Sequence, residues 1–185
     1  MKKYTKIAAL ALIAFGFMAC MQANKSEEKE VGDVAANDTN TTMQQIGLSL
    51  NDTSLTKVEK TEAEWKKQLT DNQYYILRKK GTERPFQNEF NENHKKGHYF
   101  CAACKLPLFS SETKFNSGIG WPSFYDVIDK NRVKEVVDKS LGMVRGEIVC
   151  ARCEGHLGHL FDDGPKPTGL RYCMNSGAML FQESK

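Results

Sequence analysis

The pattern of apolar and polar positions divides the chain into three parts. Ile7–Met18 is a continuous apolar run, residues 21–56 are mostly polar without regular apolar spacing, and regular patterns begin near residue 57. A polar segment of this kind cannot bury enough surface to offset the entropy of ordering it. We therefore expect one folded domain over residues 57–185, preceded by a flexible polar linker over residues 20–56.

Two short helices are predicted at the start of this domain. Thr61 followed by Glu64 is a capping-box pattern, and the helix that follows would bury Trp65. A second helix is predicted over Asn72–Lys80, with Asp71 as its N-terminal cap. Their aromatic residues are expected in the core.

Beyond Pro85 the helical period disappears, and short apolar or alternating runs replace it. Glycine, proline, asparagine and aspartate separate these runs, as is typical of antiparallel sheet. We predict a mainly β domain of the α+β class in which the sheet follows the two helices. The predicted strands are His98–Cys101, Leu108–Phe109, Ser123–Val127, Val133–Asp138, Met143–Cys150, His159–Phe161 and Leu170–Met174.

The N-terminal apolar run has the features of a bacterial export signal. Lysines precede it, and it is too short to span a bilayer comfortably. It ends in Phe17-Met18-Ala19-Cys20, which resembles the lipobox of bacterial lipoproteins, where the cysteine is lipidated. We expect residues 1–19 to be a signal peptide of the lipoprotein type. Cys20 would then anchor an exported protein in the cell envelope, on the periplasmic side.

The net charge indicates no further partner. The formal net charge is +3, and the export signal contains three lysines, Lys2, Lys3 and Lys6. The mature chain is therefore electrically even, so we expect no nucleic acid and no acidic partner. We expect a monomer.

Four cysteines form two C-x-x-C pairs, Cys101 with Cys104 and Cys150 with Cys153. Two such turns can present four thiolates to one tetrahedral ion and close a structural site with no open position. Zinc is the predicted metal, although four thiolates also suit iron. Disulfides are the alternative, because exported proteins commonly contain them. No helix pattern follows either pair, as it would in a thioredoxin-like site.

Cys173 is left outside these pairs. If residues 171–175 form a strand, Arg171, Cys173 and Asn175 share one face of it. A cationic neighbour favours the thiolate, which is the nucleophilic form of cysteine. The alternative is a buried, inert cysteine, the commoner fate of a lone thiol.

Histidines and acids near Cys173 favour a catalytic site. His156 and His159 follow the second cysteine pair in a glycine-rich segment, and Asp163 lies just beyond them. A thiol, an acid–base imidazole and an orienting carboxylate are therefore available together. The same set describes a cysteine hydrolase, and the histidines could also be ordinary polar loop residues.

An aromatic pair lies on a turn bounded by glycine and proline. Trp121 and Phe124 are either core residues or, because such turns tend to lie at the surface, an exposed patch. An exposed indole would suit a small apolar group such as a methyl.

Taken together, these motifs resemble those of the methionine-R-sulfoxide reductases, the MsrB family. The motifs are Cys101-Ala-Ala-Cys104, Gly120-Trp-Pro-Ser-Phe124, Cys150-Ala-Arg-Cys153, Gly155-His-Leu-Gly-His159-Leu-Phe-Asp-Asp163-Gly-Pro165 and Arg171-Tyr-Cys173-Met-Asn175-Ser176. The resemblance covers about residues 57–182. It implies two antiparallel sheets with short N-terminal helices, the β-tent fold of the family, and the zinc-binding branch of that family.

The resemblance also implies an activity, the thiol-dependent reduction of methionine-R-sulfoxide in oxidised proteins and peptides. Cys173 would attack the sulfoxide sulfur and become a sulfenic acid. The other implied roles are His159 and His156 beside the departing oxygen, Asp163 orienting the ring, Asn175 and Arg171 positioning the site, and Trp121 and Phe124 around the methyl group.

One position departs from the family pattern. Many members have a resolving cysteine where this chain has Ile119. We therefore expect an external thiol, such as a thioredoxin-like protein, to reduce the sulfenic acid; recruitment of a zinc-site cysteine is the less simple alternative. Two further functions remain as alternatives, a non-enzymatic zinc module that binds peptides and a thiol–disulfide oxidoreductase that uses its C-x-x-C pairs.

Overall fold

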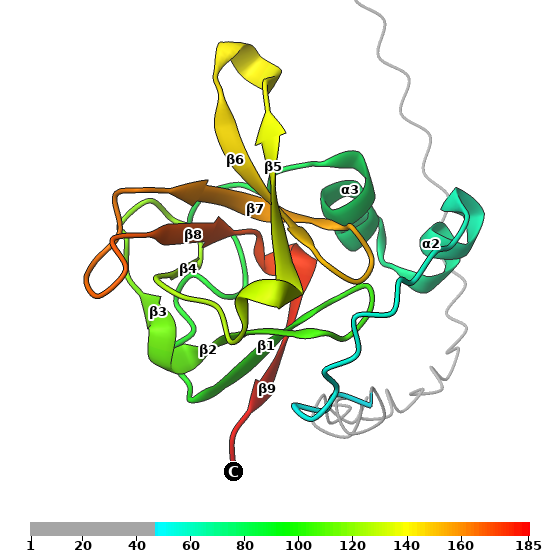
Figure 1. Ribbon diagram of the computed structural model, residues 1–185, viewed down its shortest axis with the longest axis horizontal. Helices are drawn as coiled ribbons and strands as arrows, with labels where there is room; N and C mark the ends of the chain where they lie inside the picture. The colour runs from blue at the N-terminus through cyan, green and yellow to red at the C-terminus, as the bar shows by residue number, and fades with distance from the viewer. Residues whose placement is uncertain (1–46) are drawn as a thin grey trace, which may run out of the picture. The chain divides into compact units, whose positions relative to one another are not determined.

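The computed structural model describes residues 47–185, which contain two antiparallel sheets and two short helices (Figure 1). The predicted mainly β class and the two-sheet arrangement are confirmed. The expected signal peptide and residues 20–46 of the expected linker lie outside the described residues. Within residues 47–185, no helix is both long and apolar enough to cross a membrane.

Each sheet is built from strands that are distant in sequence. The helices are α2 (Glu62–Gln68) and α3 (Asp71–Lys79). In spatial order, the three-stranded sheet contains β2 (Pro107–Ser110), β1 (Gly97–Cys101) and β9 (Met179–Glu183). The six-stranded sheet contains, again in spatial order, β3 (Lys114–Phe115), β4 (Ser123–Phe124), β8 (Arg171–Met174), β7 (His156–Phe161), β6 (Arg145–Cys150) and β5 (Val133–Asp138).

Both helices begin at a capping box. The Thr61 hydroxyl accepts the amide hydrogen of Glu64, and the Glu64 carboxylate accepts that of Thr61, as the sequence predicts. The cap of α3 is Thr70 rather than Asp71, because Gln73, three residues after Thr70, completes the same reciprocal pair. Asp71 is the first residue inside the helix.

The predicted strands are present, with different lengths in most cases. β5 has the predicted bounds, whereas β7 starts three residues earlier than expected, at His156. The sequence pattern misses β3 and β9. β9 pairs with β1 along its whole length, from Gly97 opposite Glu183 to Cys101 opposite Met179. Long-range pairing of this kind leaves little local signal.

An aromatic core joins the two sheets. Tyr99 and Phe109 come from the three-stranded sheet, and Phe124 and Tyr172 come from the six-stranded sheet. The Phe109 and Phe124 rings stack with centroids 4.4 Å apart, and Tyr99 meets Phe124 edge-on at 5.0 Å. All four residues are buried, so this cluster holds the face of the six-stranded sheet opposite the site described below.

The end of the expected linker packs against the second cysteine turn. The Arg152 guanidinium donates to both carboxylate oxygens of Asp52 at 2.7 and 2.8 Å and to the Ser54 carbonyl at 2.7 Å. The amide of Val58 donates to the Arg152 carbonyl. Asp52 and Ser54 were expected to belong to the flexible linker, whereas these contacts hold them against the folded domain. A charge-assisted contact with a buried arginine is the physical reason.

Candidate active site and metal centre

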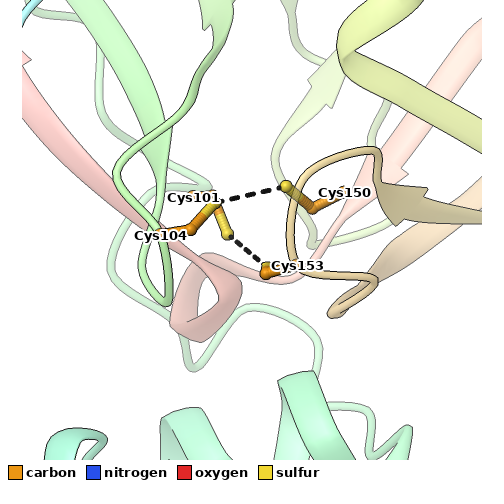
Figure 2. A group of neighbouring side chains, drawn as sticks. All are labelled: Cys101, Cys104, Cys150 and Cys153. Atoms are coloured by element: carbon orange, nitrogen blue, oxygen red, sulfur yellow. Dashed lines mark hydrogen bonds between the residues drawn. The ribbon is translucent and has the colours of Figure 1, made fainter. Parts of the chain in front are cut away.

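The two C-x-x-C pairs lie in turns of the same geometry. After β1, the amide of Lys105 donates to the Cys101 carbonyl at 2.9 Å, and Lys105 has a φ of 65°. Between β6 and β7, the amide of Glu154 donates to the Cys150 carbonyl at 2.9 Å, and Glu154 has a φ of 57°. Each turn directs its two cysteine side chains toward the other turn (Figure 2).

The four sulfurs of Cys101, Cys104, Cys150 and Cys153 lie within 4.8 Å of one another. The sulfurs of Cys101 and Cys153 are 3.6 Å apart, and those of Cys104 and Cys150 are 3.5 Å apart. A tetrahedral ion with zinc–sulfur bonds of about 2.3 Å requires sulfurs about 3.8 Å apart. All four are free thiols, which argues against the disulfide alternative.

This donor set fits one structural zinc ion. When bound, the ion ties the two turns together and contributes folding energy. Four thiolates complete its tetrahedral shell, so no position remains for a substrate or a water.

A bulge in β7 brings two histidines to one face of the six-stranded sheet. The register between β6 and β7 shifts beside Leu157, which has no partner residue in β6. In a regular strand, His156 and His159 would point to opposite faces because side chains alternate. The extra residue keeps their rings together, with centroids 5.3 Å apart. The glycine-rich segment that contains both histidines is therefore a bulged strand.

Cys173 lies beside these histidines. β8 runs between β4 and β7, and Cys173 is directly opposite Ser123 on one side and His159 on the other. Residues directly opposite each other in antiparallel strands share a face and have Cβ atoms about 5 Å apart. The thiol and the His159 imidazole are therefore neighbours on one face.

Asp138 orients the His159 ring, not Asp163 as predicted. The Nε2 atom of His159 lies 2.9 Å from the Asp138 carboxylate, which also accepts a 2.7 Å hydrogen bond from Arg145. Hydrogen bonds from the backbone and side chain of Ser140, and the bond from His159, hold the pKa of Asp138 well below its usual range. An ionised Asp138 fixes Nε2 as a protonated nitrogen and leaves Nδ1 for the substrate.

His156 is held by a second carboxylate, Glu147. Its Nδ1 lies 2.8 Å from Glu147, which also accepts a 2.7 Å hydrogen bond from Lys80. Burial lowers the pKa of His156, so the ring is neutral at neutral pH and donates through Nδ1. Its Nε2 is buried and has no hydrogen-bond partner among the described residues. An unprotonated imidazole nitrogen is thus left beside His159.

Asp163 instead pairs with Arg171. The guanidinium donates two parallel hydrogen bonds of 2.7 Å to the Asp163 carboxylate and lies over the Phe161 ring, 4.2 Å from its centroid. The hydrogen bonds from Arg171, together with its charge, hold the pKa of Asp163 below its ordinary value. Asp163 acts on the site through Arg171, because it fixes the plane of the guanidinium next to Cys173.

The segment around Glu83 positions two more groups. Its amide donates to the Asn175 side-chain oxygen at 3.2 Å, and its carbonyl accepts the Trp121 indole hydrogen at 3.0 Å. The Asn175 side chain also donates to the Leu157 carbonyl at 3.2 Å. The loop at Glu83 thereby fixes the Trp121 indole and the Asn175 side chain, and Asn175 in turn holds Leu157, the bulged residue of β7.

These groups surround a pocket of about 260 Å³. Apolar side chains form one part of its wall, and polar groups with the Cys173 thiol form the other. His156 is not part of the wall. The lining residues are Thr82, Ile119, Trp121, Arg145, Gly158, His159, Phe161, Arg171, Cys173, Met174 and Asn175.

Phe124 lies outside this pocket, contrary to the prediction that it surrounds the substrate methyl group. It is fully buried, and it stands opposite Tyr172, whose ring also points into the core between the sheets. Period two gives the reason, because the neighbouring Ser123 occupies the face of Cys173 and Phe124 must take the other. Phe161, which the sequence analysis did not single out, supplies the second aromatic wall beside Trp121.

Comparison with known proteins agrees with this geometry. Residues 69–183 match the SelR domain, which covers more than half of the chain. Proteins named peptide methionine sulfoxide reductase MsrB are similar over nearly their whole length. The protein from Methanosarcina barkeri is 60% identical over 125 residues, 68% of this chain and 88% of the relative. The protein from Agrobacterium fabrum is 53% identical over 133 residues, 72% of this chain and 98% of the relative.

The chain belongs to the MsrB family.

The resemblance to this family is therefore confirmed, and its four paired cysteines cluster as a possible zinc site. The two carboxylates that hold the histidines of this MsrB chain were not predicted from its sequence. Glu147 had a detectable signal, because it is a charged residue within the predicted strand Met143–Cys150, next to the apolar Ile148 and Val149. Asp138 had none, because an aspartate at the end of a strand is also a common turn residue.

The thiol of this MsrB site is protonated at rest. Burial raises the pKa of Cys173 to about 11, against the opposing effect of the Arg171 charge. This differs from the expectation that a cationic neighbour would make it a thiolate. The Arg171 charge is shared with Asp163, which reduces its effect on the sulfur.

The resting thiol predicts slow alkylation at neutral pH. With a pKa of about 11, the rate of reaction of Cys173 with iodoacetamide should rise about tenfold per pH unit between pH 8 and 10, because the thiolate is the reactive form. Mass spectrometry of the zinc-loaded protein measures the rate. The Cys173→Ser variant corrects for the cluster cysteines. A plateau below pH 9 would contradict the assignment.

Proposed function

We propose that this protein reduces methionine-R-sulfoxide in peptides and proteins to methionine, with Cys173 as the nucleophile. The deciding observation is the division of its cysteines. Of the five cysteines in the described part of the chain, four form the metal cluster and Cys173 lies in a separate pocket beside His159. Its relatives carry the name of this activity.

The chemistry requires a nucleophile and a proton donor together. The Cys173 sulfur attacks the sulfoxide sulfur, while a proton is delivered to the sulfoxide oxygen. The hydroxyl group then passes to the Cys173 sulfur, so the substrate leaves as methionine and the cysteine becomes a sulfenic acid. The substrate sulfur gains two electrons and the Cys173 sulfur loses two. The thiol loses one proton and the sulfoxide oxygen gains one, so no net proton is taken up or released.

His159 is placed to move that proton. It is next to Cys173, its Nε2 is fixed by Asp138, and its Nδ1 can take the thiol proton and return it to the oxygen. A sulfoxide oxygen leaves poorly until it is protonated, so this proton transfer lowers much of the activation barrier to reduction. His156 favours this proton transfer, because its ring is neutral and therefore places no competing positive charge beside His159.

The rest of the pocket binds and orients the substrate. Trp121 and Phe161 provide aromatic surface for the methyl group of the sulfoxide. Arg171 and Asn175 lie on the same face as Cys173 and donate hydrogen bonds toward a polarised oxygen. Enclosure by aromatic rings removes water and strengthens these interactions.

A thiol outside this chain returns the enzyme to its starting state. Ile119 lines the pocket where a resolving cysteine would lie, and the four other described cysteines are in the metal cluster. The sulfenic acid therefore reacts with an external thiol to give a mixed disulfide and water. A second thiol of that reductant releases Cys173. A thioredoxin-like dithiol protein has the required chemistry.

The cellular setting we propose follows from the N-terminal sequence. Residues 1–19 act as an export signal, and Cys20 is lipidated, so that the polar linker holds a monomeric catalytic domain on the periplasmic side of the envelope. Its substrates there would be oxidised exported proteins, and its reductant a periplasmic thioredoxin-like protein. The support is the charged, apolar and lipobox-like order of residues 2–20.

Activity on each sulfoxide epimer tests the proposed function. With dithiothreitol, the purified protein should reduce the R epimer of a methionine-sulfoxide peptide and leave the S epimer unchanged. Cys173→Ser should lower kcat by at least about 1,000-fold, because the nucleophile is lost. Chromatography of the peptide products measures both. Turnover by Cys173→Ser at the wild-type rate would exclude the mechanism.

A single turnover without reductant tests how the sulfenic acid is resolved. One equivalent of substrate should leave a sulfenic acid on Cys173, which dimedone labels and mass spectrometry locates. Ile119→Cys is the matched comparison, since it puts a thiol in the pocket and should divert the product into a disulfide. A disulfide to Cys173 in the wild-type protein would contradict direct reduction by an external thiol.

Fractionation of cells that express the full chain tests the location. The wild-type protein should be found with the membrane fraction and carry a lipid mass on Cys20, because the acyl chains provide the anchor. Cys20→Ser should remove both the lipid and the membrane association. An unprocessed wild-type chain that still begins at Met1 would rule out the export signal.

A further inference from the structure

Phe86 is an exposed aromatic residue next to the active-site pocket. Its side chain is 65% exposed, and its φ of 58° lies in the left-handed region. Bulky side chains rarely adopt this conformation because of the steric conflict between Cβ and the backbone. The fold thus accepts strained backbone and keeps a large apolar ring in water. Such a combination is typical of positions kept for binding.

Hydrogen bonds hold Phe86 in this conformation. Its amide donates to the Gly120 carbonyl at 2.8 Å, and the same carbonyl accepts a 2.7 Å hydrogen bond from the Asn88 side chain. Asn88 in turn accepts a hydrogen bond of 2.9 Å from the Ser176 hydroxyl. Ser176 follows β8 closely, so the loop that carries Phe86 is tied to the strand that carries Cys173.

The Phe86 ring lies over Gly120. A Cβ atom added to Gly120 would be 2.7 Å from Cδ2 of Phe86, so the close approach depends on glycine. The residues on either side, Ile119 and Trp121, both line the pocket. The ring therefore lies over the residue between two residues that line the pocket.

The pocket itself is better suited to a methionine sulfoxide residue within a polypeptide than to the free amino acid. In the described part of the molecule, no acidic residue is among those that line it. A free amino acid would bring an ammonium group that needs such a partner when it leaves water. A residue within a polypeptide brings amide groups instead, and its neighbours in the chain lie outside the pocket.

We propose that Phe86 forms an outer subsite that binds an apolar side chain next to the methionine sulfoxide in a polypeptide substrate. This inference rests on the proposed function and specifies its substrate as oxidised segments rich in apolar residues. Such segments are buried in intact proteins and become exposed when oxidation disturbs a core. The Phe86 ring offers them apolar surface beside the reactive pocket.

Two peptides test this subsite. Each is blocked at both ends and has one central methionine-R-sulfoxide, flanked on both sides by leucine in one peptide and by serine in the other. For the wild-type protein, kcat/KM should be roughly tenfold higher for the leucine peptide, because part of each apolar side chain leaves water. The ratio of the two kcat/KM values is the readout.

Phe86→Gly should bring this ratio close to one. Glycine removes the ring and adopts a positive φ without strain, so the loop is retained. Phe86→Leu should keep most of the ratio because it retains an apolar side chain. Tyr75→Ala is the matched control, since Tyr75 is 53% exposed, also packs on a glycine, Gly81, and does not line the pocket. It should keep the wild-type ratio.

The outcomes separate the two proposals. A wild-type ratio near one, an unchanged ratio in Phe86→Gly, or an equal loss in Tyr75→Ala would overturn the subsite while sulfoxide reduction stands. Failure of the wild-type protein to reduce either peptide would overturn the proposed function and the subsite with it.

Discussion

The convergence of four sulfurs on one point is the constraint on which the rest of the site depends. One pair of cysteines follows β1 of the three-stranded sheet, and the other pair connects β6 to β7 of the six-stranded sheet. A zinc ion held there would fix the place where β7 begins, because Cys153 is three residues before His156. If β7 slipped by one residue, both histidines would move to the opposite face. With its shell closed by four thiolates, the ion would act on the site through strand register and would supply no open position for chemistry.

Ion pairs then decide how each polar group in the site behaves. Each histidine faces a carboxylate, and each carboxylate is held by a cation, Arg145 for Asp138 and Lys80 for Glu147. The third pair joins Arg171 to Asp163. Because the charges are paired, the surroundings of Cys173 are nearly neutral and burial keeps its proton in place. A protonated thiol is also a store of the proton that the sulfoxide oxygen needs.

Much of the domain could be predicted because its signals are local. One capping box, helix-capping residues and short apolar runs located the helices and most strands, and cysteine spacing predicted the metal centre. The errors occur where partners are distant in sequence. Asp163 was expected to orient His159, but Arg171 is paired with it and Asp138 takes that place. Phe124 was expected in the pocket, but its pairing opposite Tyr172 directs it into the core.

The sequence by itself determined the chemistry available to this protein, which is a set of four thiolates for one metal and a separate thiol with two histidines. Residue types and the short spacings between them can be read from the sequence without knowledge of the fold. The tertiary structure alone decided which carboxylate meets which histidine, which aromatic ring faces the substrate and whether Cys173 keeps its proton. These properties depend on strand register, on the bulge at Leu157 and on burial. Each arises from contacts between segments that no local pattern relates.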